Sequence, residues 1–372
     1  MLTPAGRGAL AVVGVAGPAA AAFVGRLFSP RGGDPLPDRP DGGIVFGRWT
    51  GGEDGPGEEL VVVRRGADDL EIHCHGGLAA AEAVLTSLAR QGAVRQSWPA
   101  WLRAGGTAEI EVEAREALAR AGGPKAARML SRQLAGALEA ELARVRALLE
   151  SGHGRDARQA IDRLLRASRV GLRLVRPWRV VLVGSVNVGK SSLVNALAGF
   201  ARSIVSPEAG TTRDLLETRI VLDGWEVDLI DTAGLRDEST SGAAEGATER
   251  AGIDRAVAAC EAADLVLRVV EAGAPAEPHA ATLQPGDLLV RSKADLAGGT
   301  AAVPGGEVWT SAVAGVGIAD LVAMIVHRLV PEESDEPGLL SGAVPFTDRQ
   351  VALIEALLRA MDGMSVGNTG GP

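Results

Sequence analysis

The chain has 372 residues, of which 46% are hydrophobic and 23% are charged. This composition is that of a globular protein of two or three domains and excludes a mostly disordered chain. A net charge of −9, and an aromatic content of 3% without tyrosine, argue against a protein that coats nucleic acid along its whole length or stacks single-stranded bases. The two cysteines cannot form a disulfide framework, so we expect a cytoplasmic location.

Residues 1–103 are predicted to form a small α+β domain. Apolar runs predict strands at 9–15, 44–49, 60–63 and 70–74. A helix is predicted at 78–90. Residues 9–24 also resemble the apolar part of a signal peptide. At 16 residues, interrupted by glycines and a proline, this run is too short to span a bilayer. A strand, a Gly-Pro turn and a helix start explain it equally well, and we expect no membrane association.

Residues 104–176 are predicted to be helical. One apolar stripe at helical spacing runs from Leu130 to Leu149, and a second runs from Ile161 to Leu172. The residues at 151–154, Ser-Gly-His-Gly, separate the stripes and predict an antiparallel helix pair. Residues 115–176 contain 14 basic and 6 acidic residues. This positive surplus is explained either by a solvated helix face or by a surface for a polyanion such as tRNA.

Residues 177–331 alternate between strands and helices. The expected strands lie at 180–183, 219–222, 227–230, 265–270 and 288–291, and the expected helices begin at Ser191, near residue 250 and at Gly317. This alternation predicts a mostly parallel sheet covered on both faces. In the last region, 332–372, an acidic linker at 332–337 is followed by a helix that Thr347 and Gln350 open as a capping box. The predicted fold is therefore a multidomain α/β protein with an N-terminal α+β domain, a helical domain and an inserted P-loop domain.

The P-loop is formed by residues 184–191, GSVNVGKS, which fit the pattern G-x-x-x-x-G-K-[ST] between an apolar strand and a helix. The glycines let backbone N–H groups fold round a β-phosphate. Lys190 would reach the β- and γ-phosphates, and Ser191 would bind Mg²⁺. Of the 38 basic residues only three are lysines, and two of these, Lys190 and Lys293, lie in nucleotide motifs. The predicted binding residues of this segment are Gly184, Asn187, Val188, Gly189, Lys190, Ser191 and Ser192.

Two segments are predicted to complete the phosphate side of the site. Asp231 ends an apolar strand, which places its carboxylate beside Mg²⁺, and Gly234 provides a flexible position near the γ-phosphate. Thr211 and Thr212 lie in the sequence GTTRD, where a threonine can close over Mg²⁺ and the γ-phosphate. The predicted magnesium ligands are therefore Ser191, Thr212 and Asp231.

The base is expected to bind at the sequence Ser292-Lys293-Ala294-Asp295. Asp295 can accept both hydrogen bonds from guanine N1–H and the exocyclic amino group, and the Lys293 stem packs along the base. Ser311 and Ala312 would complete the pocket through a backbone N–H. Ser292 stands where this motif usually has asparagine, and its shorter hydroxyl is expected to hold the loop less firmly.

This ordered set resembles the translation-factor-related GTPases, and the whole chain resembles one family, the tRNA wobble-uridine modification GTPases (MnmE/TrmE). The resemblance covers most of residues 2–361. It is carried by the opening TPAGRGALAVVGVAGP, by EIHCHGG at 71–77, by GTTRD and DTAGLR, and by the order of the regions. It implies a GTP-binding and GTP-hydrolysing protein that uses Mg²⁺ and K⁺. It further implies a homodimer, an FAD-dependent partner subunit and tRNA as the substrate.

The resemblance also implies how hydrolysis is catalysed. Leu235 occupies the position where other GTPases carry a water-orienting glutamine. In the family, the residue matching Asn187 helps to bind a K⁺ ion that takes the place of an arginine finger. Glu249 matches a glutamate that positions water, with Glu245 as a weaker rival. Glu249 is equally explained as a solvated carboxylate at a helix start. The catalytic residues are thus predicted to be Glu249, Thr212 and Asn187.

Two departures from the family leave a second function open. The family's C-terminal Cys-x-Gly-Lys motif is absent, and residues 98–103, WPAWLR, replace a signature built around Gly-Glu-Phe-Thr and Asn-Gly-Lys. Both belong to the region where the family binds a folate one-carbon donor. The alternative is a divergent GTPase switch that has lost the modification chemistry. The basic helices favour the first function, and the missing cysteine favours the second.

The sequence His73-Cys74-His75 invites comparison with a zinc site. On a strand the two histidines share one face and Cys74 points to the other, so one face offers only two ligands. A strand end leading into a helix is the better interpretation.

Overall fold

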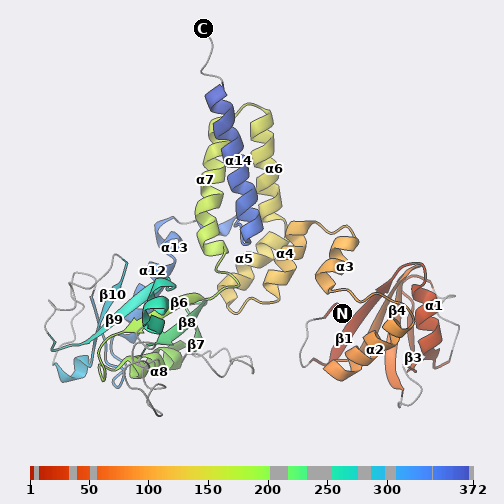
Figure 1. Cartoon of the computed structure of the whole chain (residues 1–372), viewed down its shortest axis with the longest axis horizontal. Coiled ribbons are helices and arrows are strands. Elements are labelled where there is room, and N and C mark those ends of the chain that lie inside the picture. Colours follow the sequence, from red (N-terminus) through yellow and green to blue (C-terminus); the bar gives the residue numbers. More distant parts are fainter. Residues whose placement is uncertain are drawn as a thin grey trace, which may run out of the picture. The chain divides into compact units, whose positions relative to one another are not determined.

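The computed structural model describes residues 1–3, 8–32, 40–50, 57–201, 217–232, 254–274, 286–297, 307–336 and 338–367 (Figure 1). The chain divides into two compact units, Met1–Val112 and Glu113–Pro372. Each unit has its own sheet, five-stranded in the first and six-stranded in the second.

The first unit is built on an antiparallel sheet with the strand order β1-β5-β4-β3-β2. Alternate strand residues point into one core, together with Val24 and Leu27 of α1 and Val84 and Leu88 of α2, so both helices cover the same face. The predicted strands and helix are confirmed, and β2 and α3 are additional. The elements are β1 (Leu10–Ala16), α1 (Ala20–Leu27), β2 (Phe28–Pro30), β3 (Ile44–Trp49), β4 (Glu58–Gly66), β5 (Asp69–His75), α2 (Leu78–Arg90) and α3 (Trp98–Ala104).

The predicted helix pair of the second unit contains one more break than its apolar pattern suggested. The first stripe is divided at Gly136, whose φ of +93° is left-handed and ends the helical hydrogen bonding. The last helix lies alongside the second stripe (Figure 1). The helices here are α5 (Pro124–Leu134), α6 (Ala137–Glu150), α7 (Gly154–Gly171) and α14 (Asp348–Gly367), together with the greater part of α4 (Glu109–Leu118), which begins before the unit boundary.

The sheet of the second unit has the order β11-β10-β9-β6-β8-β7 and is parallel except for β7. The expectation of a mostly parallel sheet is confirmed. Its helices are α8, α12 and residues 254–261, and the last of these packs on Val181 and Ile230. The elements are β6 (Trp178–Val183), α8 (Lys190–Ala201), β7 (Glu217–Leu222), β8 (Trp225–Asp231), β9 (Leu265–Glu271), β10 (Leu288–Ser292), β11 (Glu307–Trp309) and α12 (Ile318–Leu329).

The acidic segment predicted as a linker contains a short helix, α13 (Glu332–Asp335), and leads to the 3₁₀ turn η3 (Leu339–Ser341). Beyond it the predicted cap of α14 is present, because the Gln350 N–H donates to Thr347 Oγ1 at 3.2 Å. The Gln350 side-chain oxygen accepts from the Phe346 N–H at 2.8 Å, one residue before the cap. Among the described helices, none is both long and apolar enough to cross a membrane.

Candidate nucleotide site

The P-loop follows β6 and leads directly into α8. Gly184 and Gly189 have φ values of +157° and +94°, and Asn187 between them has a φ of +64°. A Cβ at Gly184 would lie 2.3 Å from the Val269 carbonyl oxygen, so the loop packs on the backbone of β9 as only glycine allows. Asn187 and Ser192 are exposed, whereas Val188 is buried. The loop therefore offers an exposed tip on a rigid base.

Lys190 begins α8 and is 5% exposed. Its ammonium donates to the carbonyl oxygens of Gly184 at 3.0 Å and Ser185 at 2.9 Å. These bonds hold the positive charge across the P-loop. An ammonium in this position can neutralise phosphate oxygens that approach the loop backbone.

Ser191 and Asp231 meet although they are 40 residues apart. Their contact is a hydrogen bond of 2.5 Å from Ser191 Oγ to Asp231 Oδ2, and Asp231 is 3% exposed. Parallel pairing of Leu182 with Asp231 brings the two strand ends to one edge of the sheet. A hydroxyl and one carboxylate are oxygen ligands that suit Mg²⁺, which takes its remaining ligands from water and phosphate. In the described part of the chain no group of three or more His, Cys, Asp or Glu could hold a metal.

Thr232 contributes to the geometry of the site, although it was not among the predicted site residues. Its hydroxyl donates to the Leu182 carbonyl oxygen at 2.8 Å, which fixes the end of β8 against the end of β6. The signal in the sequence was its place directly after Asp231.

Ser292 joins the end of β10 to the P-loop. Its hydroxyl contacts the Val188 carbonyl oxygen at 2.5 Å and the Val270 carbonyl oxygen at 3.1 Å, and the residue is 5% exposed. A serine thus reaches the P-loop directly from this position.

The remaining base-side residues lie on two neighbouring loops. Lys293 has a φ of +58° and its ammonium is ion-paired with Glu271. Asp295 is exposed in the 3₁₀ turn η2 (Ala294–Leu296). Ser311 is 1% exposed and donates its N–H to the Val316 carbonyl oxygen at 2.9 Å, whereas Ala312 is half-buried. A hydrogen bond of 3.0 Å from the Ala294 N–H to the Thr310 carbonyl oxygen holds these loops together.

Some predicted site residues lie outside the described residues. They are the catalytic candidates Thr212 and Glu249, with Glu245 and Leu235, and the phosphate-side positions Thr211 and Gly234.

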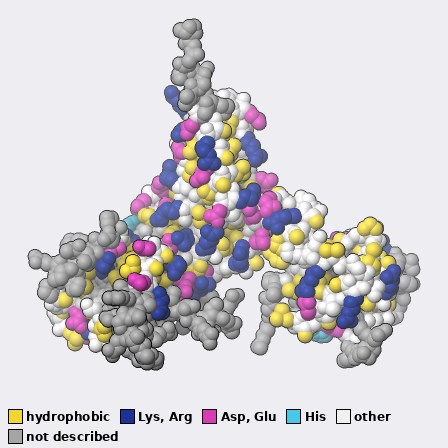
Figure 2. Space-filling model, in the orientation of Figure 1, with side chains coloured by type: hydrophobic (Ala, Val, Ile, Leu, Met, Phe, Trp, Pro, Cys, Tyr) yellow, Lys and Arg dark blue, Asp and Glu magenta, His cyan; other side chains and the backbone are white. Residues whose placement is uncertain are grey.

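The basic residues of the helical region are largely used inside the second unit. Arg163 donates to the Gly338 carbonyl oxygen at 2.9 Å, Arg166 pairs with Glu336 at 3.3 Å, and Arg169 pairs with Glu332 at 3.2 Å. On the face that Figure 2 shows, basic and acidic side chains alternate over these helices. Arginines of α7 therefore hold the acidic segment that follows α12, which is a role neither sequence interpretation included. Arg128, Arg146 and Arg155 are exposed.

In the first unit, the side chains of the His73-Cys74-His75 segment alternate as predicted. Cys74 is 1% exposed, and burial raises the pKa of its thiol. His73 Nε2 contacts Glu71 at 3.1 Å, and His75 Nδ1 contacts Glu58 at 2.8 Å. The two imidazoles thus each have a carboxylate partner on a neighbouring position of the sheet.

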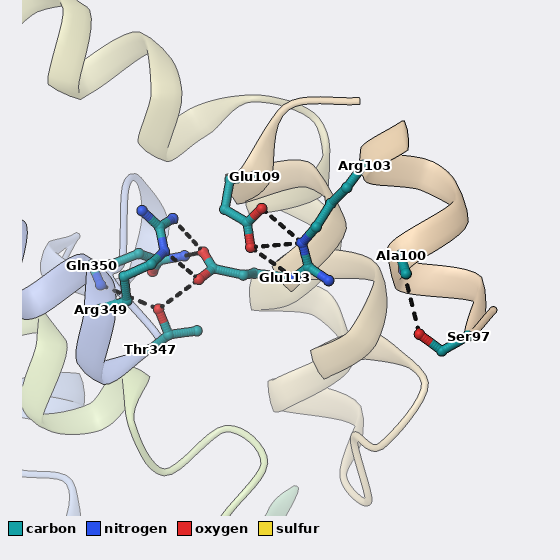
Figure 3. Close-up of polar contacts among 8 residues, drawn as sticks. All are labelled: Ser97, Ala100, Arg103, Glu109, Glu113, Thr347, Arg349 and Gln350. Atoms are coloured by element: carbon teal, nitrogen blue, oxygen red, sulfur yellow. Dashed lines mark hydrogen bonds and ion pairs between the residues drawn. The ribbon is translucent and has the colours of Figure 1, made fainter. Parts of the chain in front are cut away.

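The segment that departs from the family signature forms α3. Ser97 caps it by accepting the Ala100 N–H at 3.4 Å, and Arg103 is ion-paired with Glu109 at 2.7 Å (Figure 3). The Trp101 ring lies 3.0 Å from where a Cβ of Gly14 would be, so the helix packs on β1.

Comparison with known proteins identifies the family. The 50S ribosome-binding GTPase family matches residues 179–293. The tRNA modification GTPase MnmE of Synechococcus sp. (strain CC9605) is 35% identical over 96% of this chain and 86% of its own. That of Methylobacterium radiotolerans is 34% identical over 98% and 88%. Among solved structures, the G domain of the T. maritima FeoB iron transporter matches 41% of this chain and 99% of its own at 25% identity, with a TM-score of 0.29. The chain is a GTPase and belongs to the tRNA modification GTPase MnmE family.

Proposed function

We propose that the chain binds GTP with Mg²⁺ at the P-loop edge of the β6–β11 sheet and that its hydrolysis cycle serves the modification of wobble uridine in tRNA. The observation that carries the proposal is the meeting of Lys190, Ser191 and Asp231 at one edge of a parallel sheet. Lys190 supplies the cation for the β- and γ-phosphates, and backbone N–H groups of residues 184–189 bind the phosphate oxygens.

The magnesium ion would be held by Ser191 and, directly or through water, by Asp231, with Thr212 as a further ligand. The bond between the first two would open so that both oxygens turn to the ion. Mg²⁺ would neutralise charge that develops on the phosphates during hydrolysis.

Guanine would be recognised by Asp295, with the Lys293 stem along the base. The Ser311 N–H is used within its loop, so the backbone donor to the base would come from Ala312. Ser292 would support the base site by binding the Val188 carbonyl oxygen of the P-loop.

Catalysis would use K⁺ bound by Asn187 and water positioned by Glu249. The exposed side chain of Asn187 at the loop tip is compatible with an ion shared between two GTPase domains of a homodimer. A bound monovalent cation there would supply the charge that an arginine finger supplies in other GTPases.

The tRNA would contact the helical region between residues 115 and 176 through arginines exposed on its surface, Arg128, Arg146 and Arg155. An FAD-dependent subunit would be the partner in the modification reaction. The chain would work in the cytoplasm, where its two free cysteines would stay reduced.

The test combines nucleotide turnover with mass spectrometry of tRNA. A strain that lacks the chain is complemented with the wild type or with Lys190→Ala, and the wobble uridines are quantified. We expect the wild type alone to restore the modified nucleoside and to hydrolyse GTP in vitro. Unchanged nucleosides on deletion, with normal GTP turnover, would favour the switch that has lost the modification chemistry.

A further inference from the structure

The turn between β7 and β8 is a two-residue hairpin at the far end of the strands from the P-loop. Asp223 and Gly224 have φ values of +44° and +83°, the left-handed pair that a type I′ turn requires. β8 begins at Trp225, directly after the turn, and ends at Asp231. This strand therefore joins the turn to the proposed magnesium ligand.

Lys125, at the start of α5, binds the turn from outside the sheet. Its ammonium is 2.8 Å from Asp223 Oδ2 and 2.9 Å from Glu333 Oε1, and it lies 5.7 Å from the centre of the Trp225 ring. The Trp225 indole N–H donates to Glu333 Oε2 at 3.0 Å. We call Lys125, Asp223, Trp225 and Glu333 the Lys125 cluster. It joins α5, the β7–β8 turn and α13.

The backbone approaches closely at the same place. The Lys125 N–H donates to the Gly224 carbonyl oxygen at 3.4 Å. A Cβ at Gly123 would lie 2.5 Å from that oxygen, so only glycine allows the contact. The turn is thus held both by its backbone and by a side chain.

The cluster is buried on one side and open on the other. Trp225 is 2% exposed, whereas the side chains of Lys125, Glu333 and Asp223 are 25%, 38% and 66% exposed. Burial lowers the pKa of Lys125, but the ion pairs with Asp223 and Glu333 outweigh it and raise that pKa, so the ammonium is charged at neutral pH. An exposed pair such as Lys125–Asp223 is weakly held and can open without loss of the fold. The chain uses lysine here although it uses arginine almost everywhere else, and a compact ammonium fits between two carboxylates above a ring.

We infer that Lys125 is a positioning residue that couples the nucleotide state of the GTPase site to the helical region, through the β7–β8 hairpin and α13. The inference rests on the proposed function, because the signal begins with Mg²⁺·GTP at Asp231, where β8 ends. A strand cannot stretch, so a shift at Asp231 moves Trp225 and the turn with it. This movement would lengthen or shorten the contacts of Asp223 with Lys125 and of Trp225 with Glu333.

The test uses the reciprocity of coupled equilibria: if the nucleotide changes the cluster, the cluster must change the relative affinity for nucleotides. The dissociation constants of GDP and of a non-hydrolysable GTP analogue are measured with Mg²⁺ for the full chain. We expect Lys125→Met, which keeps the apolar stem over Trp225, to change the ratio of the two constants by roughly fivefold. Lys125→Arg keeps the charge but not the compact ammonium, so its ratio should lie between those of the wild type and Lys125→Met. Asp223→Asn should change the ratio in the same direction as Lys125→Met. Arg144→Met, which removes an exposed pair with Glu141 within α6, is the matched control and should leave the ratio unchanged.

A purely structural role would lower the unfolding temperature but change both constants alike, and that result would overturn the inference. Amide hydrogen exchange gives a second readout. The Lys125 N–H should exchange at different rates with GDP and with the analogue in the wild type, and at one rate in Lys125→Met. Equal rates in the wild type also overturn the inference. If the wild type binds neither nucleotide, the proposed function itself fails, which is a distinguishable result.

Discussion

The Ser292 hydroxyl lies 2.5 Å from the Val188 carbonyl oxygen, so the base-binding side and the P-loop are joined by one short contact. The pair is 104 residues apart in the chain, and both residues are buried. This single hydroxyl therefore holds the P-loop at Val188, directly before Gly189 and Lys190, against the end of β10.

Removal of this hydroxyl should weaken nucleotide binding more than its size suggests. Ser292→Ala leaves the Val188 carbonyl without this donor, which costs about 1–2 kcal/mol of unfolding free energy. We expect GDP to bind roughly fivefold more weakly, measured by calorimetry. Ser131→Ala serves as the control, because the Ser131 hydroxyl donates only to the Ala127 carbonyl oxygen, at 2.8 Å, one turn earlier in the same helical segment. Equal GDP affinities in the two variants would show that Ser292 does not hold the P-loop.

Lys190→Ala should lower GTP affinity by roughly 100-fold, because a charge-assisted contact to phosphate is lost from a buried position. The loop itself should keep its shape, since Gly184 and Gly189 set its backbone. Fluorescent-nucleotide titration gives the affinity and circular dichroism verifies the fold. Near-wild-type affinity would contradict the assignment of the phosphate site.

GTP hydrolysis should be faster in K⁺ than in Na⁺, and the difference should depend on the Asn187 side chain. Asn187 has a φ of +64°, so the test must distinguish the loss of the side-chain amide from strain in the backbone. Asn187→Gly keeps this backbone conformation available, and Asn187→Ala strains it. Loss of K⁺ stimulation in both variants is the expected outcome of steady-state turnover in the two salts. Stimulation that survives in Asn187→Gly would exclude the amide as the ligand.

Glu113 anchors α14 to α4, as Figure 3 shows. It accepts from Arg349 Nε at 2.6 Å and Nη2 at 2.8 Å, and from Gln350 Nε2 at 2.7 Å, with its side chain 10% exposed. Glu113→Gln breaks a largely buried charge pair and should lower the unfolding free energy by about 2 kcal/mol. The cost stays moderate because the Arg349 side chain is partly exposed and keeps contact with water. Chemical denaturation measures the change, and Glu150→Gln at an exposed helix end is the control. A cost no larger than that of the control would mean that the anchor contributes nothing.

The sequence by itself determined the elements whose structure depends on neighbouring residues. The strand, loop and helix around residues 178–201 follow from an apolar run, two glycines that accept left-handed backbone and a helix-forming stretch. The same holds for the cap at Thr347, where donor and acceptor are three residues apart. Short strands such as β2 and β11, three residues each, were missed because they are too short to show an alternating pattern.

Only the tertiary structure decided which distant side chains meet. Nothing in the pattern of α7 indicated that Arg163, Arg166 and Arg169 bind the segment after α12, and their charge alone was equally compatible with solvent or tRNA. The partners of Ser292 and Lys125 lie on other elements, at 104 and 98 residues' separation, so they depend on how the sheet and helices pack. A residue's type sets what it can bind, but the direction of its side chain relative to a distant partner is set by the packing of whole elements.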